Sequence, residues 1–388
     1  MGRILRGGKD GAMIYRPEID GLRAVAVVPV ILFHAGLAGF SGGFVGVDVF
    51  FVISGYLITT IILADLAAGR FSIARFYERR ARRILPALSV VMLACLPFAW
   101  AWMLPGELAA FGKSLIATAL FGSNILFWRE SGYFDATTEL KPLLHTWSLA
   151  VEEQYYLFFP PLLALLWRWR RGLVMPALLG GALASLALAE WGARHVPSAN
   201  FYLLPTRMWE LLIGAMVAWQ HSRSPRMMAS RVVAEAAGLA GLGLILYAVV
   251  VFDAATPMPG LWTLIPVGGT ALVLGLARHG TWAAHLLGWR PLVGIGLISY
   301  SAYLWHQPVL AFARIRLITA PEGWLLVVLL AATFGLAWLS WRYVEQPFRG
   351  AAPWLPGGRR IGLAPLASIG AACLIGAALL AGGGFGGR

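Results

Sequence analysis

Residues 45–64 read VGVDVFFVISGYLITTIILA, and this stretch decides the class of the fold. A transmembrane α-helix needs about 20 consecutive, mostly apolar residues. This run has that length and contains one charged side chain, Asp48. It therefore predicts a helix that crosses a membrane.

Similar apolar stretches recur along the rest of the chain. They lie at 22–40, 84–104, 111–128, 147–167, 173–190, 203–219, 236–252, 261–277, 297–313, 324–344 and 361–382. Of the 388 residues, 59% are hydrophobic and 13% are charged, whereas a typical soluble domain has about 25% charged residues. We predict an all-α polytopic integral membrane protein.

The domain organisation follows from the same pattern. Residues 1–14 form a basic tail, 15–350 form one transmembrane domain, and 351–388 hold a linker, a last transmembrane helix and a glycine-rich tail. The apolar content excludes a disordered chain. Both cysteines, Cys95 and Cys373, lie inside apolar runs, which excludes a disulfide scaffold.

The net charge of +13 does not indicate nucleic-acid binding. The basic residues gather in short clusters between apolar runs, as expected where Lys and Arg set the orientation of membrane helices. Residues 65–83 carry six arginines and are predicted to be cytoplasmic, as are 168–171. The N-terminus is then inside. Arg314 and Arg316, in the vicinity of a predicted external loop, depart from the rule.

The number of crossings follows from these orientations. If 84–104 runs outward and 147–167 ends inside, 111–128 cannot cross the membrane completely. This segment contains Lys113, Ser114, Ser123 and Asn124, which fits a re-entrant or interfacial helix that lines a cavity. Eleven crossings remain, with the C-terminus outside.

Arg23 and His34 are the first ionisable pair inside a predicted span. Eleven residues make about three helical turns, so both side chains project from one face, roughly 16 Å apart along the axis. Ionisable groups inside a membrane are functional candidates unless they pair structurally. The alternative is an arginine at the membrane edge and a histidine hydrogen-bonded to a neighbour.

Asp48 lies at a depth similar to that of His34, because a short turn at 41–44 joins the first two spans. A carboxylate beside a histidine fixes its tautomer and stabilises its charged form, as a general base requires. Alternatively, Asp48 pairs with an arginine and holds helices together.

Four arginines within five positions, Arg79, Arg80, Arg82 and Arg83, precede the third span. Guanidinium groups bind phosphate bidentately, which favours a phosphate-rich cytosolic ligand. The alternative is a plain topology anchor. Because no Walker loop or dinucleotide fingerprint accompanies the arginines, ATP and NAD are excluded.

Further polar residues at helix ends are acceptor-side candidates. They are His145, Glu152 and Glu153 of the segment HTWSLAVEEQ, with Tyr303 and His306 of the segment YLWHQP. Adjacent residues on a helix point about 100° apart, so at most one of Glu152 and Glu153 faces the interior fully. Arg207 and Glu210, three residues apart, are expected to form a structural ion pair. No metal site is expected.

Taken together, several ordered motifs resemble the membrane-bound acyltransferase family 3, in its bacterial O-antigen acetylase branch. They are YRPEIDGLRA at 15–24 followed by His34, GGFVGVDVFFVISG at 42–55, Arg80-x-x-Arg83 with Pro86, SGYF at 131–134, HTWSLAVEEQ at 145–154, and SYSxYLWH at 299–306. The matches span roughly residues 15–350.

The resemblance implies ten core helices and an eleventh, here 361–382, which in this branch leads to a periplasmic domain. It implies a bacterial cytoplasmic membrane, acyl-CoA (acetyl-CoA above all) as donor without a tightly bound cofactor, and the hydroxyl of a glycan or lipid-linked saccharide as acceptor. It assigns His34 the central catalytic role, Arg23 a supporting role, and Arg80 with Arg83 a role connected with CoA.

These inferences combine into one hypothesis. Acyl-CoA places its phosphates near Arg80 and Arg83, with Arg79 and Arg82 nearby, and its pantetheine arm passes Arg23 to reach His34. Asp48 orients His34, and an acceptor hydroxyl lies near Glu152 and His145. The competing class is a transporter or flippase for a sugar or lipid-linked substrate. Such proteins often have paired segments broken by Gly or Pro in corresponding halves of the chain. This sequence shows no such pair, which argues against a transporter.

Overall fold

A computed structural model describes residues 15–130, 139–223, 230–277, 280–317, 321–349 and 358–385, with side chains left out for 358–366. Every regular element in these ranges is helical, which confirms an all-α polytopic membrane protein. The predicted tail at 1–14 and the SGYF motif at 131–134 lie outside the described residues.

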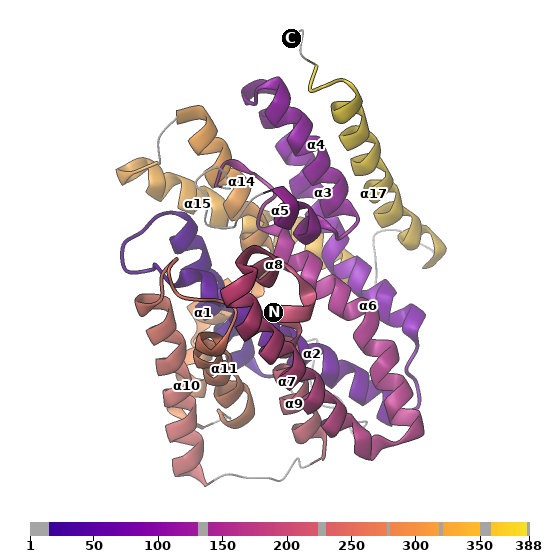
Figure 1. Cartoon of the computed structure of the whole chain (residues 1–388), viewed down its shortest axis with the longest axis vertical. Helices are drawn as coiled ribbons and strands as arrows, with labels where there is room; N and C mark the ends of the chain where they lie inside the picture. The colour runs from indigo at the N-terminus through magenta and orange to yellow at the C-terminus, as the bar shows by residue number, and fades with distance from the viewer. Residues whose placement is uncertain are drawn as a thin grey trace.

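The helices follow the chain in the order shown in Figure 1. They are α1 Pro17–His34, α2 Gly46–Ala67, α3 Ile73–Trp102, α4 Pro105–Ala119, α5 Ser123–Glu130, α6 Thr146–Trp169, α7 Val174–His195, α8 Pro197–Tyr202, α9 Leu204–Arg223, α10 Arg231–Val251, α11 Leu264–Leu276, α12 Trp282–Leu287, α13 Arg290–Leu297, α14 Ser299–Leu317, α15 Gly323–Ser340, the π-helical turn Trp341–Glu345, α16 Gln346–Arg349 and α17 Gly358–Ala381.

Each predicted span overlaps a helix. Within the described ranges, five helical stretches are long and apolar enough to cross a membrane by length and composition: Gly43–Ala67, Ile73–Trp102, Arg171–His195, Arg231–Val251 and Gly323–Arg349. The third helix begins earlier than predicted, at Ile73 instead of residue 84. The Ser72 hydroxyl accepts a hydrogen bond from the backbone N–H of Arg75 and thereby caps the start of this helix. The arginine cluster therefore lies on a helix.

The segment predicted to be re-entrant is broken into α4 and α5. The break falls at Leu120–Gly122, where Phe121 has a left-handed backbone with φ 52°. Asn124, just after the break, is buried and donates to the Gln154 side chain and to the backbone carbonyl of Tyr202. Its polar group faces protein and not lipid, as an irregular backbone inside a membrane requires.

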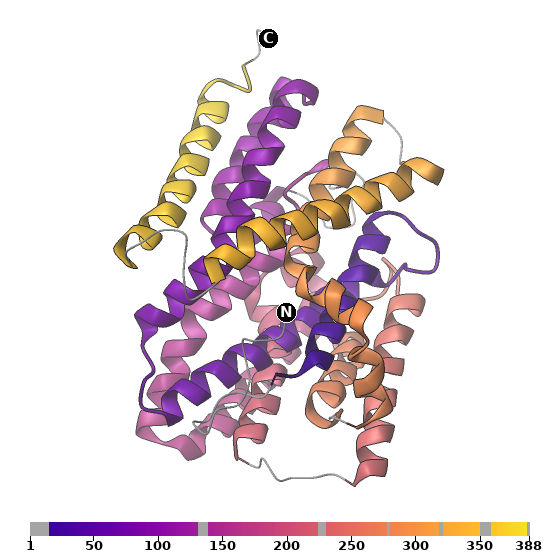
Figure 2. The same cartoon turned by 180° about the vertical axis from the view of Figure 1, so that it is seen from behind.

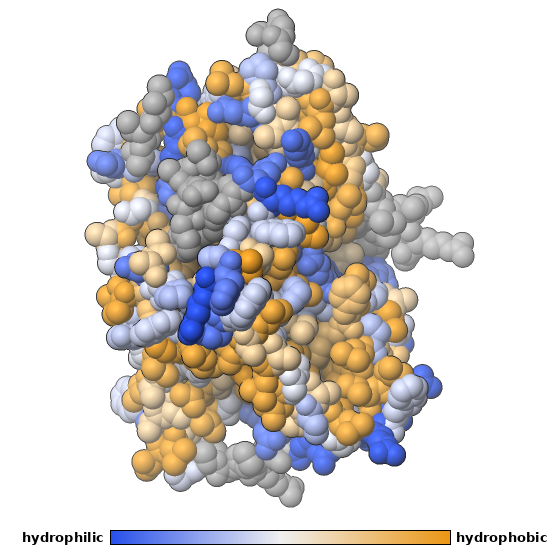
Figure 3. All heavy atoms as spheres, viewed as in Figure 1, coloured by the Kyte–Doolittle hydropathy of each residue, from blue (hydrophilic) through white to orange (hydrophobic). Residues whose placement is uncertain are grey.

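Helices α1, α2, α6, α9 and α14 lie around the centre of the bundle, where α2 packs along α9 and α1 along α13 and α14. Seen from behind, α15 crosses the other helices obliquely (Figure 2). Hydrophobic residues cover broad areas of the face shown in Figure 3, and hydrophilic ones form clusters in its middle and upper parts and along its lower edge.

Two glycines allow α2 and α9 to approach closely. A methyl group on Gly55 would lie 1.9 Å from the backbone oxygen of Leu211, and one on Gly214 would lie 2.0 Å from that of Val52. Small residues at such crossings let helix backbones meet inside a membrane.

We expect Gly55→Ala to lower the thermal unfolding midpoint in detergent, because the new methyl group must separate α2 from α9. Overpacking of this kind costs about 1–3 kcal/mol. Gly243→Ala on α10 is the matched control, since its methyl group would meet no described atom within 4 Å. Equal midpoints for the two variants would contradict this account of the interface.

Candidate active site

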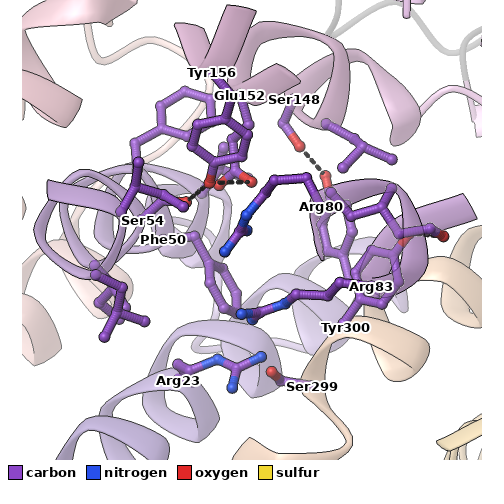
Figure 4. Close-up of a pocket in the computed structure, with 18 residues that line it drawn as sticks. Arg23, Phe50, Ser54, Arg80, Arg83, Ser148, Glu152, Tyr156, Ser299 and Tyr300 are labelled. Atoms are coloured by element: carbon purple, nitrogen blue, oxygen red, sulfur yellow. Dashed lines mark hydrogen bonds between the residues drawn. The ribbon is translucent and has the colours of Figure 1, made fainter. Parts of the chain in front are cut away.

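A cavity opens between α1, α2, α3, α6 and α14, and three arginines point into it (Figure 4). The empty space inside the cavity and its open mouth is about 790 Å³. The polar lining residues are Arg23, Arg80, Arg83, Glu152, Ser54, Tyr156, Ser148, Ser299, Tyr300 and Tyr303.

The arginine cluster of α3 divides according to helical spacing. Arg80 and Arg83, three residues apart and hence on one face, both line the cavity. Arg79 instead pairs with Asp65, with 2.8 Å between Nη2 and Oδ2, and its side chain is 50% exposed. Arg82 pairs with Glu78 on its own helix. Of the four arginines predicted to bind acyl-CoA, Arg80 and Arg83 line the cavity and Arg79 and Arg82 do not.

Arg80 is held against one wall of the cavity. Its guanidinium lies 5.1 Å from the ring centroid of Tyr156, and a cation over an aromatic face is attracted by the ring quadrupole. The Tyr156 hydroxyl donates to Glu152 at 3.3 Å and contacts the hydroxyl of Ser54. This network fixes the wall opposite Arg23 and Arg83.

Glu152 lines the arginine cavity together with Arg80, whereas the sequence analysis grouped it with His145. The reason is the direction of α6, which carries Glu152 two turns away from His145. As predicted from the angle between neighbours, only one of the two glutamates faces inward: Glu153 is not part of the cavity lining.

Arg23 reaches the cavity from α1, as predicted. Its guanidinium pairs with Asp20, one turn earlier, at 3.2 Å. Arg80 and Arg83 have no carboxylate within ion-pair distance among the described residues. Three arginines and one carboxylate, Glu152, line the cavity, so its lining carries an excess of positive charge, which attracts anionic groups.

Three histidines from separate helices meet beyond the far end of the cavity. The ring centroid of His306 lies 5.1 Å from that of His34 and 5.4 Å from that of His145. Tyr303, which lines the cavity, lies 5.3 Å from His306 and 5.4 Å from His145. The predicted acceptor-side residues Tyr303, His145 and His306 are thus brought together with His34.

Tyr303 forms the boundary between the cavity and the histidines. Its hydroxyl is 2.7 Å from Ser148 Oγ and donates to the backbone oxygen of His145 at 2.8 Å. The ring of Phe50, also on the cavity wall, lies 6.4 Å from that of Tyr303. A group that leaves the arginine cavity for the histidines must pass this boundary.

His34 is oriented by its own helix. Its Nδ1 lies 2.9 Å from the backbone oxygen of Val30, one turn earlier. Because a carbonyl only accepts hydrogen bonds, Nδ1 carries the proton and Nε2 the lone pair of the neutral ring. The hydrogen bond made by one ring nitrogen selects the tautomer of a histidine. The Val30 backbone oxygen therefore selects the tautomer of His34, a role that the sequence analysis gave to Asp48.

The predicted partnership of Asp48 with His34 is wrong. The Asp48 carboxylate lies 2.6 Å from Nη1 of Arg207, which also pairs with Glu210 at 3.0 Å as predicted. Arg207 further donates to the backbone oxygen of Phe201 and lies over the rings of Phe201 and Trp147. All three charged side chains are at most 2% exposed, and they join α2 to α9.

Arg314 is a site residue that the sequence analysis did not select. Its guanidinium donates to the backbone oxygen of His34 and pairs with Glu139 at 3.3 Å. It thereby satisfies a carbonyl at the end of α1, where helix carbonyls lack partners. Its departure from the expected charge distribution was the signal that could have revealed it.

With this geometry in place, comparison with known proteins gives the family. A family model described as an acyltransferase domain matches residues 16–342. The chain belongs to this acyltransferase family. The match includes all the helices that form the arginine cavity and the histidine cluster.

Named relatives point in the same direction. The chain is 33% identical over 354 residues to peptidoglycan O-acetyltransferase OatA of Listeria monocytogenes, covering 86% of this chain and 56% of OatA. It is 36% identical to the putative membrane-bound transacylase BcsY of Komagataeibacter xylinus, covering 93% of this chain and 90% of BcsY. The putative peptidoglycan O-acetyltransferase YrhL of Bacillus subtilis is 34% identical, over 86% of this chain and 55% of YrhL.

The chain therefore spans a little over half the length of OatA and YrhL and nearly all of BcsY. No solved structure matches it. By name, BcsY is a putative membrane-bound transacylase, and OatA and YrhL are peptidoglycan O-acetyltransferases, the latter putative.

We expect Arg207→Leu to destabilise the bundle strongly, since it leaves two buried carboxylates without a counter-charge. Breaking a buried pair in this way costs about 3–5 kcal/mol. The triple replacement of Asp48, Arg207 and Glu210 by Leu should recover part of this loss, because no buried charge remains.

The measurement is the thermal unfolding midpoint in detergent. Arg194→Ala is the matched control, because the Arg194 side chain is 69% exposed and an exposed pair contributes no more than about 1 kcal/mol. An unchanged midpoint for Arg207→Leu would show that the cluster does not hold α2 to α9.

Proposed function

We propose that this protein is an O-acyltransferase that moves an acyl group from acyl-CoA to a hydroxyl group of a cell-surface or exported glycan. The observation that carries the proposal is that the arginine cavity and the histidine cluster adjoin at one residue, Tyr303. Three guanidiniums share one cavity with Tyr303, and Tyr303 contacts the cluster that contains His34, His145 and His306.

The arginine cavity is the proposed donor site. CoA carries several phosphates, and guanidiniums bind phosphate through paired, charge-assisted hydrogen bonds. Arg80 and Arg83 are without described carboxylate partners, so their charge is available to a ligand. The pantetheine arm then extends past Arg23 towards Tyr303.

The histidine cluster is the proposed site of chemistry. Nε2 of His34 takes the proton of the acceptor hydroxyl as its oxygen attacks the thioester carbonyl carbon. A C–O bond forms, the C–S bond breaks, and the imidazolium returns the proton to the CoA sulfur. In a two-step route Nε2 itself attacks the thioester carbonyl carbon, an N–C bond forms and the C–S bond breaks, so CoA leaves as the thiolate. The acceptor oxygen then displaces the imidazole from the acyl group, and the hydroxyl proton neutralises the thiolate.

Two features support acetyl as the acyl group and a glycan as the acceptor. Relatives are named as peptidoglycan O-acetyltransferases, and the histidines lie at the end of α1 opposite Arg23, on the side that the charge distribution assigns to the exterior. The proposed setting is a bacterial cytoplasmic membrane, with the N-terminus inside.

We expect His34→Ala to abolish acyl transfer from radiolabelled acetyl-CoA to an acceptor glycan by purified protein in detergent. Loss of a general acid–base group lowers a rate by about 10²–10⁴-fold. His195→Ala on α7 is the matched control, because its ring stacks on Trp191 at an exposed position.

Three results of this assay carry different meanings. Label retained on wild-type protein after a single turnover supports the acyl-imidazole route. Full activity of His34→Ala would overturn the assignment of His34. Uptake of substrate into vesicles without any labelled product would favour a transporter.

We expect Arg80→Ala and Arg83→Ala each to weaken binding of acetyl-CoA by about 10–100-fold, since a hydrogen bond to a charged group contributes about 1.5–3 kcal/mol. The matched controls are Arg79→Ala and Arg82→Ala, whose side chains pair with Asp65 and Glu78. Calorimetry in detergent measures the affinity. Equal effects of all four variants would indicate general charge attraction and not a defined phosphate site.

A further inference from the structure

A second cavity lies on the other side of α14, between α14, α3 and α15. The empty space inside it and its open mouth is about 860 Å³. Its lining is apolar except for one residue, Arg316, and consists of Ala94, Cys95, Phe98, Trp102, Trp305, Pro308, Val309, Phe312, Ala313, Arg316, Leu317, Leu325, Leu329 and Leu336.

The polar end of this groove is defined by Arg316 and Trp102. The ring of Trp102 lies 6.1 Å from that of Phe312, and Phe312 precedes Arg316 by about one helical turn. Trp102 is the last residue of α3, and Arg316 is in the last turn of α14. Tryptophan and arginine together are typical of the level at which membrane lipids carry their headgroups.

Arg316 is the remaining exception to the charge distribution of the loops. Arg314 is explained by the His34 carbonyl and by Glu139. Arg316 is exposed, and no carboxylate lies within ion-pair distance of it among the described residues. Its charge is thus available at the mouth of an apolar groove.

We propose that the groove binds an anionic phospholipid of the bilayer, with an acyl chain between α3, α14 and α15 and its phosphate on Arg316. The apolar lining accepts a hydrocarbon chain and nothing polar. A guanidinium at one end pairs with a phosphate through charge-assisted hydrogen bonds. The combination matches the two chemical parts of a phospholipid.

The lipid would steady the helix that carries part of the proposed active site. Trp305 lines the groove while the next residue, His306, contacts His34 and His145. Trp305 also donates to the Ser340 hydroxyl on α15. An occupied groove therefore fixes the rotation of α14 and with it the position of His306.

The test measures lipid binding directly, so its outcome does not depend on the proposed reaction. Purified protein is titrated with phosphatidylglycerol and, separately, with phosphatidylcholine, and the bound lipid is counted by native mass spectrometry alongside the thermal unfolding midpoint. For the wild type we expect one tightly held phosphatidylglycerol and a higher midpoint than in phosphatidylcholine.

Arg316→Ala should weaken phosphatidylglycerol binding by about tenfold and remove the difference in midpoint, whereas Arg316→Lys should retain part of both. Ala313→Trp should displace the chain by filling the groove. Arg194→Ala, which removes an exposed arginine on α7, is the control and should bind as the wild type does.

Two results would overturn the proposal. One is undiminished phosphatidylglycerol binding by both Arg316→Ala and Ala313→Trp. The other is displacement of phosphatidylglycerol by an equimolar polyisoprenyl phosphate, which would make the groove a site for a lipid-linked saccharide.

Discussion

The buried contact of Arg207 with two carboxylates is the interaction on which the site depends. Inside a bilayer no water is available to solvate these charges, so the three groups must satisfy one another. Asp48 belongs to the first turn of α2, and Arg207 and Glu210 belong to α9. Their contact fixes α2, which supplies Phe50 and Ser54 to the arginine cavity.

The same guanidinium also reaches α6. It lies over the ring of Trp147, two residues from His145. It also lies over the ring of Phe201 and donates a hydrogen bond to the Phe201 backbone oxygen, and these contacts restrict its rotation. This buried cluster thus sets the start of α6, which directly follows His145 and carries Glu152. Arg207 therefore influences the geometry of the cavity although it does not line it.

Much of the fold could be predicted from the sequence, because apolar length alone identifies membrane helices. The ion pair of Arg207 with Glu210 likewise followed from helical periodicity. Local rules of this kind depend on neighbours in the chain, which the sequence gives directly.

The errors concern contacts between distant segments. Asp48 was assigned to His34 from similar depth, but depth does not give rotation about a helix axis, and Arg207 of α9 occupies the side that Asp48 faces. Glu152 was placed with the acceptor because its motif begins near His145, although two helical turns carry it back to Arg80. In the sequence, Arg314 stood out only as a basic residue near a predicted external loop. Its role depends on the backbone oxygen of His34, and no sequence pattern identifies a backbone oxygen as a partner.

The phenol of Tyr303 has a consequence for the membrane itself. The proposed reaction draws its donor from one side of the membrane and serves the other, so it would need a polar passage through a barrier to ions. The hydroxyl of Tyr303 is hydrogen-bonded to Ser148 and to the backbone oxygen of His145, and its ring lies 6.4 Å from that of Phe50. On that proposal, Tyr303 closes the passage between the arginine cavity and the histidines and limits the leakage of ions.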